Sequence, residues 1–234
     1  DQLLIMAKLC AVLLAACAAL LALGAARSTL AGDPGMLQDL CVADYMSLQG
    51  PLRVNGYPCK PAENVTADDF FYGGLASAAD VYGGGNPMGS VVTTADVERL
   101  PGLNTLGVSM SRIDYAPWGG TNPPHSHPRA TEILYVAEGT LEVGFVTTAG
   151  RHITRGVPRG GVFVFPRGMM HYERSVGEAP AVAISAFDSQ LPGTQRLGEA
   201  MFGATPGVPT DVLARALQTD GGVVESIRAK FQPK

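Results

Sequence analysis

Four side chains in two short stretches of the chain have the types and spacing of a metal site. His125, His127 and Glu132 lie within GGTNPPHSHPRATEILYVAEG, and His171 follows a proline-glycine turn in GGVFVFPRGMMHYERS. Side chains two residues apart on a strand point to the same face, so His125 and His127 can coordinate the same ion. Three imidazoles and one carboxylate leave two positions open on an octahedral ion. This set suits Mn, Fe, Ni, Cu or Zn, and ligand type alone does not choose among them.

The fourth histidine of the chain illustrates the alternative interpretation. A lone histidine is more often a packed or solvated residue than a metal ligand. His152 lies between Arg151 and Ile153 in a polar stretch, with no partner at ligand spacing. We therefore expect His152 to face solvent, and we place the metal on the other three histidines and Glu132.

Short strands separated by turn residues are expected to position these ligands. The predicted strands are residues 91–93, 106–115, 132–137, 141–147, 162–165 and 181–187. Leu106, Val108 and Met110 alternate with small residues, and Leu141 and Val143 alternate likewise. Such alternation predicts an antiparallel sandwich or barrel with its apolar face turned inward. Near the C-terminus, apolar residues at helical spacing predict helices over residues 194–202, 210–218 and 222–231.

The first residues of the chain have the pattern of a secretory signal peptide. Lys8 precedes an apolar run over residues 9–23, and small residues follow at 24–26. We expect cleavage after Ala26 or nearer Asp33, and an initiator at Met6 with residues 1–5 as an upstream extension. A membrane anchor is the alternative, although the run is a little short for a span. The expected divisions are a signal peptide (1–26), an N-terminal disulfide-bonded segment (27–86), a β-barrel (87–192) and a helical segment (193–234).

Cysteine use and a glycosylation sequon agree with export. Two of the four cysteines fall inside the expected signal peptide, which leaves Cys41 and Cys59. In an oxidising compartment these two most simply pair with each other, and two free buried thiols are the alternative. Asn64 begins Asn-Val-Thr, an N-glycosylation sequon. The formal net charge is -4 and no basic stripe is present, which argues against a nucleic-acid partner.

The two ligand stretches resemble the two motifs of the cupin superfamily. The matching residues, in order and spacing, are Gly119, His125, His127, Glu132 and Gly139 in the first motif and Gly160, Pro166, Gly168 and His171 in the second. Within these motifs, the sequences TNPPHSHPRATE and VFPRGMMHY resemble those of plant germins and germin-like proteins still more closely. This resemblance extends from about Asp33 to the C-terminus. The segments LQDLCVAD and VNGYPCK around the two cysteines resemble the disulfide segment of the same family.

The resemblance implies a fold, a metal and a setting. The fold would be all-β, a cupin jelly-roll β-barrel with C-terminal α-helices and the metal inside the barrel. The metal would be manganese (Mn²⁺) on His125, His127, Glu132 and His171. The protein would be a glycoprotein secreted to the apoplast or cell wall, free of the membrane after signal cleavage, and active in defence or stress. Its subunits would form a homo-oligomer, a hexamer built as a trimer of dimers, with C-terminal helices clasping neighbours.

Several activities are compatible with such a site. A manganese ion that changes oxidation state, with an open position and net positive charge, can dismutate superoxide, and superoxide dismutase activity is known in the family. Germins with oxalate oxidase activity carry Asn where this chain has Ser111, although Asn122 keeps their other substrate-pocket amide. We therefore expect a small anionic or oxygen-derived substrate and no oxalate turnover. A non-enzymatic cell-wall or receptor-like role and nucleotide-sugar phosphodiesterase activity are the alternatives.

Overall fold

A computed structural model of the protein describes residues 38–47 and 55–231. The expected signal peptide lies outside these described residues. The chain divides into two units, Asp1–Gly32 and Asp33–Lys234, and all the described residues belong to the second. Within the described ranges, every helix is too short or too polar to cross a bilayer.

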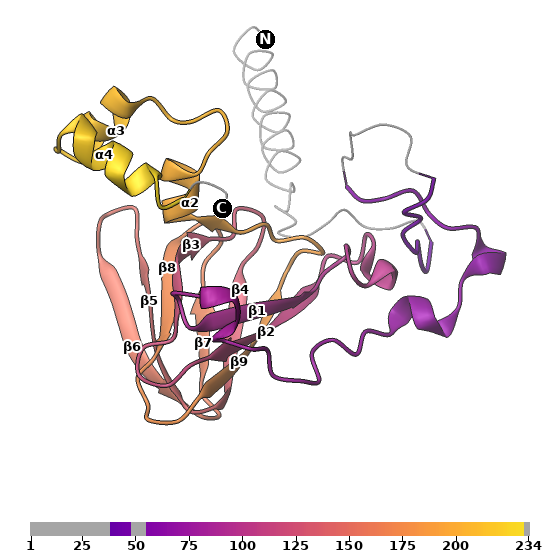
Figure 1. Cartoon of the computed structure of the whole chain (residues 1–234). Helices are drawn as coiled ribbons and strands as arrows, with labels where there is room; N and C mark the ends of the chain where they lie inside the picture. Colours follow the sequence, from indigo (N-terminus) through magenta and orange to yellow (C-terminus); the bar gives the residue numbers. More distant parts are fainter. Residues whose placement is uncertain (1–37, 48–54, 232–234) are drawn as a thin grey trace, which may run out of the picture. The chain divides into compact units, whose positions relative to one another are not determined.

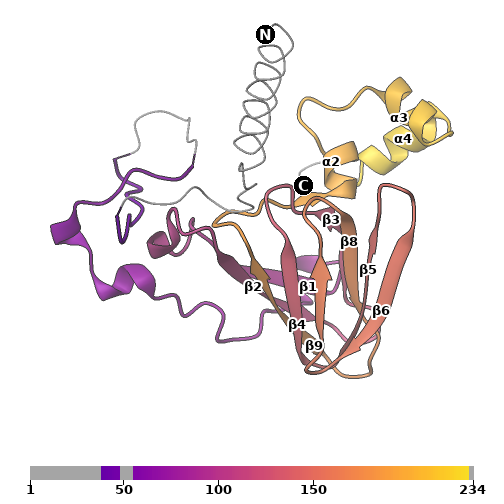
Figure 2. The ribbon, with the colours of Figure 1, turned by 180° about the vertical axis from the view of Figure 1, so that it is seen from behind.

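The described strands form two five-stranded sheets in which all pairs are antiparallel (Figure 1). The first sheet has the order β1 (Ser90–Ala95), β2 (Ser109–Tyr115), β9 (Ala181–Phe187), β4 (Glu132–Glu138) and β7 (Val162–Phe165). The second has the order β10 (Gln195–Arg196), β3 (Thr121–Ser126), β8 (Met170–Ser175), β5 (Thr140–Val146) and β6 (His152–Pro158). Figure 2 shows β4 and β9 of the first sheet side by side. The predicted all-β jelly roll is confirmed.

The apolar core lies between the two sheets, where alternate residues of each strand point inward. Leu134 and Val136 of β4 meet Leu141 and Val143 of β5, and all four side chains are fully buried. Phe165 of β7 closes the same cluster. Burying a side chain of this kind contributes roughly 1.5–3 kcal/mol. The predicted inward face of residues 141–147 is therefore confirmed for Leu141 and Val143.

The predicted inward face of β2 is wrong. Val108 and Met110 are 50% and 41% exposed, whereas Ser109, Ser111 and Ile113 are buried. The period of two is correct, but the phase is reversed, because this end of the barrel interior is lined by polar side chains rather than by the apolar core. Apolar alternation therefore marked the outer face of the sheet in β2.

Sequence analysis did not predict β6 and β10 as strands. β6 is an edge strand that pairs only with β5, and most of its side chains are exposed, so its sequence lacks an apolar alternation. Gln195 and Arg196 pair with Ser126 and His125 of β3, and this pairing delays the first C-terminal helix from the predicted residue 194 to residue 197.

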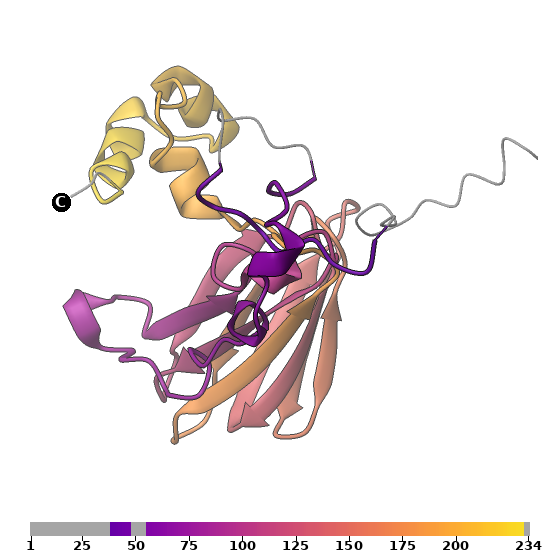
Figure 3. The same cartoon turned by 90° about the vertical axis from the view of Figure 1, so that its right-hand side faces the viewer.

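The C-terminal helices are shorter than predicted but lie in the expected order. They are α2 (Leu197–Phe202), α3 (Thr210–Ala216) and α4 (Gly221–Arg228), and they gather beyond one end of the strands (Figure 3). Leu213 of α3 and Val224 of α4 are buried where these two helices meet. Four short 3-10 turns complete the described elements: Ala62–Asn64, Ala67–Phe70, Gly83–Gly85 and Pro101–Leu103.

The predicted disulfide between Cys41 and Cys59 is present, and the two cysteines are 18 residues apart in the sequence. Asn104, which is fully buried, fixes this segment to the barrel. Its side-chain amide donates to the carbonyl oxygen of Tyr57 at 2.9 Å, and its oxygen accepts from the amide of Tyr57 at 2.9 Å. The loop is therefore closed by the disulfide and held against the barrel by the hydrogen bonds of Asn104.

Candidate metal centre

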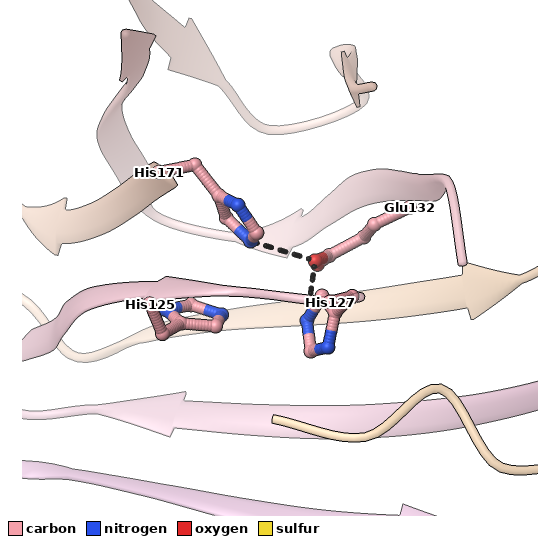
Figure 4. Close-up of side chains that lie close together, drawn as sticks. All are labelled: His125, His127, Glu132 and His171. Atoms are coloured by element: carbon pink, nitrogen blue, oxygen red, sulfur yellow. Dashed lines mark hydrogen bonds and ion pairs between the residues drawn. The ribbon is translucent and has the colours of Figure 1, made fainter. Parts of the chain in front are cut away.

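The four predicted ligands converge inside the barrel from both sheets (Figure 4). His125 lies on β3 and His171 lies opposite it on β8 of the second sheet, while Glu132 begins β4 of the first sheet. His127 follows the end of β3 directly. One ligand atom from each residue lies within 4.8 Å of all the others, and all four side chains are buried. This part of the chain therefore holds a buried His/Glu group that can bind a metal ion.

Proline content explains the local path of β3. Pro123 and Pro124 precede His125, and proline has no N–H to give to a strand ladder. The register between β3 and β8 shifts between Asn122 and His125, where the two prolines lie. His125 and His127 follow this irregularity two residues apart, and both side chains are buried within the group.

Backbone carbonyls fix the orientation of the three imidazoles in the group. The Nδ1 atoms of His125, His127 and His171 lie 2.8, 2.6 and 2.7 Å from the carbonyl oxygens of Pro123, Gly193 and Met169. A carbonyl oxygen can only accept a hydrogen bond, so each Nδ1 carries the proton. Each Nε2 therefore turns a lone pair toward the centre of the group, which is the arrangement that orients a metal-binding histidine.

Glu132 completes the group with its two oxygens in different roles. Its Oε2 lies 3.1 Å from Nε2 of His127 and 3.2 Å from Nε2 of His171, as Figure 4 shows. Its Oε1 accepts a hydrogen bond from the hydroxyl of Ser185 at 2.5 Å. Ser185 lies on β9 and is fully buried. One carboxylate oxygen is therefore fixed by the protein, and the other faces the imidazoles.

Burial and neighbouring charges set the protonation state that a metal requires. Burial is the main cause that lowers the pKa of His125 to about 3, and the neighbouring His171 and His127 lower it further. Burial opposes the charge of Glu132, but the neighbouring His127 and His171 hold the pKa of this carboxyl well below its usual range. His125 is therefore neutral and Glu132 ionised near neutral pH, and these are the forms that coordinate metal.

A cavity of about 290 Å³ adjoins the group and contains both predicted substrate-pocket residues. Ser111 and Asn122 are buried and line it together with His125, His127 and Glu132. The volume is close to the lower end of the range of small-molecule sites, so the cavity can admit a small ligand beside the metal position.

Sequence analysis missed a second buried acid behind the site. Glu173 lies on β8 two residues after His171, so it points to the same inner face. Burial is the main cause that raises its pKa well above the usual value, and the charge of Glu132 adds to the effect. Its Oε2 accepts a hydrogen bond from the hydroxyl of Tyr115 at 3.5 Å. The spacing His-x-Glu in MHYERS was the sequence signal that could have found it.

His152 lies outside the group, as expected, and its side chain is exposed. It is not without a partner, however. Its Nε2 lies 3.3 Å from the hydroxyl of Tyr172 on β8, on the far side of β5. The two predicted features nearer the N-terminus are also visible: Cys59 is paired, and Asn64 is exposed on a 3-10 turn.

Comparisons with known proteins identify similar chains. The profile of the Cupin family matches residues 77–225. Germin-like protein 1-4 of Oryza sativa subsp. japonica is 71% identical over 97% of this chain and 99% of its own length. Germin-like protein subfamily 2 member 1 of Arabidopsis thaliana is 56% identical over 86% of this chain and 89% of its own. A solved structure of recombinant oxalate oxidase in complex with glycolate superposes with a TM-score of 0.79 at 45% identity, covering 85% of this chain and 98% of that one.

Proposed function

Because the chain belongs to the germin-like proteins of the cupin family, we propose that it is a secreted plant protein that binds manganese and dismutates superoxide. The proposed ligands are His125, His127, Glu132 and His171. The observation that carries this proposal is the convergence of three imidazole lone pairs and one carboxylate oxygen at a single buried point.

Such a convergence is unfavourable without a cation at its centre. Lone pairs and a negative carboxylate oxygen repel one another when they are buried together, because little solvent screens them. A divalent ion removes that repulsion and leaves a site with one net positive charge. The carboxylate oxygen suits manganese, and the membership of the germin-like proteins favours that ion over Fe, Ni, Cu or Zn, which the imidazoles would also accept. The positive charge of the loaded site would attract a small anion into the adjoining cavity.

The chemistry that bound manganese supplies is one-electron exchange between two oxidation states, which converts two superoxide anions and two protons into dioxygen and hydrogen peroxide. The side chains around the site have three roles in this scheme. The imidazoles and Glu132 would hold the ion, Ser185 orients Glu132, and the adjoining cavity would admit the ligand.

Oxalate oxidation is the second candidate, because the similarity to a glycolate-bound oxalate oxidase favours it. Ser111 argues against it. The resemblance to germins places an asparagine of oxalate oxidases at this position, and Ser111 lines the cavity here. Serine is shorter than asparagine and offers one donor where the amide offers two. The substrate anchor would therefore be weaker, and oxalate turnover low or absent.

Elemental analysis of the purified protein, with superoxide and oxalate assays on the same sample, tests these alternatives. We expect near-stoichiometric manganese, superoxide activity and no oxalate turnover. The variant His127→Ala should lose metal and activity together, whereas His152→Ala should retain both. Activity in metal-free protein would refute the metal-centred proposal. Stoichiometric manganese with neither activity would support the non-enzymatic cell-wall or receptor-like role, and strong oxalate oxidation would refute the argument from Ser111.

We also propose that subunits associate through the outer face of the first sheet. Its exposed apolar side chains are Met110, Ile133, Tyr135, Val162 and Val164. Exposed apolar side chains that gather on one face can mark an interaction site. The hexamer of the family is the proposed assembly, and light scattering coupled to gel filtration gives the mass directly. A monomeric mass at micromolar concentration would refute it.

Secretion to the apoplast, a role in defence or stress and glycosylation at Asn64 complete the proposal. The disulfide between Cys41 and Cys59 supports export, because disulfides persist in oxidising compartments, and the exposure of Asn64 leaves its sequon accessible. N-terminal sequencing of the secreted protein would locate the cleavage site. Treatment with an N-glycosidase should lower its mass, and the Asn64→Gln variant should show no such change.

A further inference from the structure

A second cavity, of about 500 Å³, lies between β3 and α2. Figure 1 shows α2 beside the end of β3. Most of the cavity wall is apolar, and the apolar side chains include Met88, Val92, Pro123, Pro124, Leu197 and Phe231. Sites for small molecules are concave, mainly apolar and roughly 300–1,000 Å³ in volume. This cavity therefore has both the size and the lining of a small-molecule site.

The aromatic ring in this wall is held in place by α2. Phe202 of α2 stacks on Phe231, with the ring centroids 6.0 Å apart. Gly198 of α2 leaves room for the same ring, because an added Cβ would lie 2.6 Å from it. Phe231 therefore packs on its own helix, and the cavity is formed before any ligand enters. A preformed wall with an aromatic ring favours a ligand that also carries a ring.

The polar side chains of the cavity wall are already engaged within the chain. The side-chain amide of Asn86 donates to the carbonyl oxygens of Val81 and Ser90 at 3.1 and 2.9 Å. The hydroxyl of Ser90 donates to a backbone carbonyl oxygen at 2.7 Å, and Arg196 pairs with Glu199 at 3.3 Å. A peptide segment in this cavity would bring N–H and C=O groups that need new partners. A small apolar molecule needs none, so it is the better match.

We propose that the cavity between β3 and α2 binds a small, uncharged molecule that is mainly apolar and carries an aromatic ring. The site is separate from the candidate metal centre, because its lining contains none of the four proposed ligands. The two cavities share only Val92, Asn122 and Arg196 among their lining residues. The inference does not depend on manganese or on the proposed activity.

N-Phenyl-1-naphthylamine is the probe, because it is an uncharged aromatic amine whose fluorescence rises in apolar surroundings. A fluorescence titration of the secreted protein gives its dissociation constant. Leu197→Asp places a charge in the apolar wall and should weaken binding about tenfold or more, because an apolar ligand cannot pair with a charge that it covers. Phe231→Leu keeps the wall apolar without the ring and should weaken binding roughly two- to tenfold. Both residues line this cavity and not the metal cavity, so these losses would locate the probe.

The matched control is Val223→Asp. Val223 and Leu197 both lie in the first turn of a helix, where Asp is tolerated, and they are 47% and 44% exposed. Val223 does not line the cavity, so its variant should bind the probe as the native protein does. The melting temperature of each variant shows whether it is folded.

Three results would overturn the inference. The first is a native protein that does not bind the probe, and the second is an equal effect of Leu197→Asp and Val223→Asp. The third is a probe affinity that falls as the protein concentration and the mass from light scattering rise, which would assign the cavity to a contact between subunits. Metal content and superoxide turnover do not enter these measurements, so the proposed activity can fail while this site is confirmed, and the reverse.

Discussion

Replacing Ser185 with alanine should weaken metal binding although Ser185 is not a ligand. Its hydroxyl donates to Oε1 of Glu132 at 2.5 Å, and both side chains are buried, so no bulk water can replace the bond. A hydrogen bond to a charged group contributes roughly 1.5–3 kcal/mol. If the alanine variant loses that amount from the metal-bound form, the dissociation constant rises about ten- to hundredfold, at about 1.4 kcal/mol per tenfold.

Competition between the protein and a manganese chelator gives the dissociation constant of each variant. The matched control is Ser109→Ala, which removes a buried hydroxyl from the same sheet. That hydroxyl donates to the carbonyl oxygen of Ser189 at 2.7 Å rather than to a ligand. Chemical denaturation of both metal-free variants separates a general loss of stability from a specific loss of affinity. Equal dissociation constants for the two variants would refute the role of Ser185 in orienting Glu132.

Three further predictions concern stability. Breaking the disulfide by replacing Cys41 and Cys59 with serine should cost about 3 kcal/mol in unfolding free energy by the chain-entropy model, and denaturation with and without reductant should differ for the native protein alone. Asp69 accepts a hydrogen bond from Lys60 at 2.7 Å, and this bond is the main cause that lowers the pKa of Asp69. The ionised carboxylate should therefore stabilise the fold above about pH 4, and this stabilisation should be lost as the pH falls. In the Asp69→Asn variant the free energy of unfolding should depend less on pH over that range. Gly120→Ala should lower the free energy of unfolding by several kcal/mol, because the added Cβ would lie 2.5 Å from backbone atoms and overpack this part of the barrel. An unchanged melting temperature would contradict that geometry.

The ligands could be predicted from the sequence because their spacing is local and their chemistry is distinctive. His125 and His127 are two residues apart on an extended segment, and the structure turns both inward. What orients them could not be predicted. The carbonyl that fixes His127 belongs to Gly193, which is 66 residues away, and the hydroxyl that fixes Glu132 belongs to Ser185, which is 53 residues away. Such contacts depend on sheet order, which local spacing does not encode.

The fold class was predictable for the same reason, and the phase of individual strands was not. The apolar alternation of Leu141 and Val143 marked a true inner face. That of Val108 and Met110 marked the outer face, since the inner residues Ser109 and Ser111 of β2 are polar and line the cavity. Alternation reports which side of a strand is apolar, and that side is the core only where the interior is apolar. The domain divisions drawn from the sequence stay a prediction.

The ligands of the metal centre come from opposite layers of the sandwich. Glu132 belongs to the first sheet, whereas His125 and His171 belong to the second. An ion held by all of them is a cross-link between the layers, and the sheets cannot part at that end until it dissociates. The rate of ion loss would then limit the rate at which the holoprotein opens to proteases. The same ion that supplies the chemistry would set the working lifetime of the folded chain.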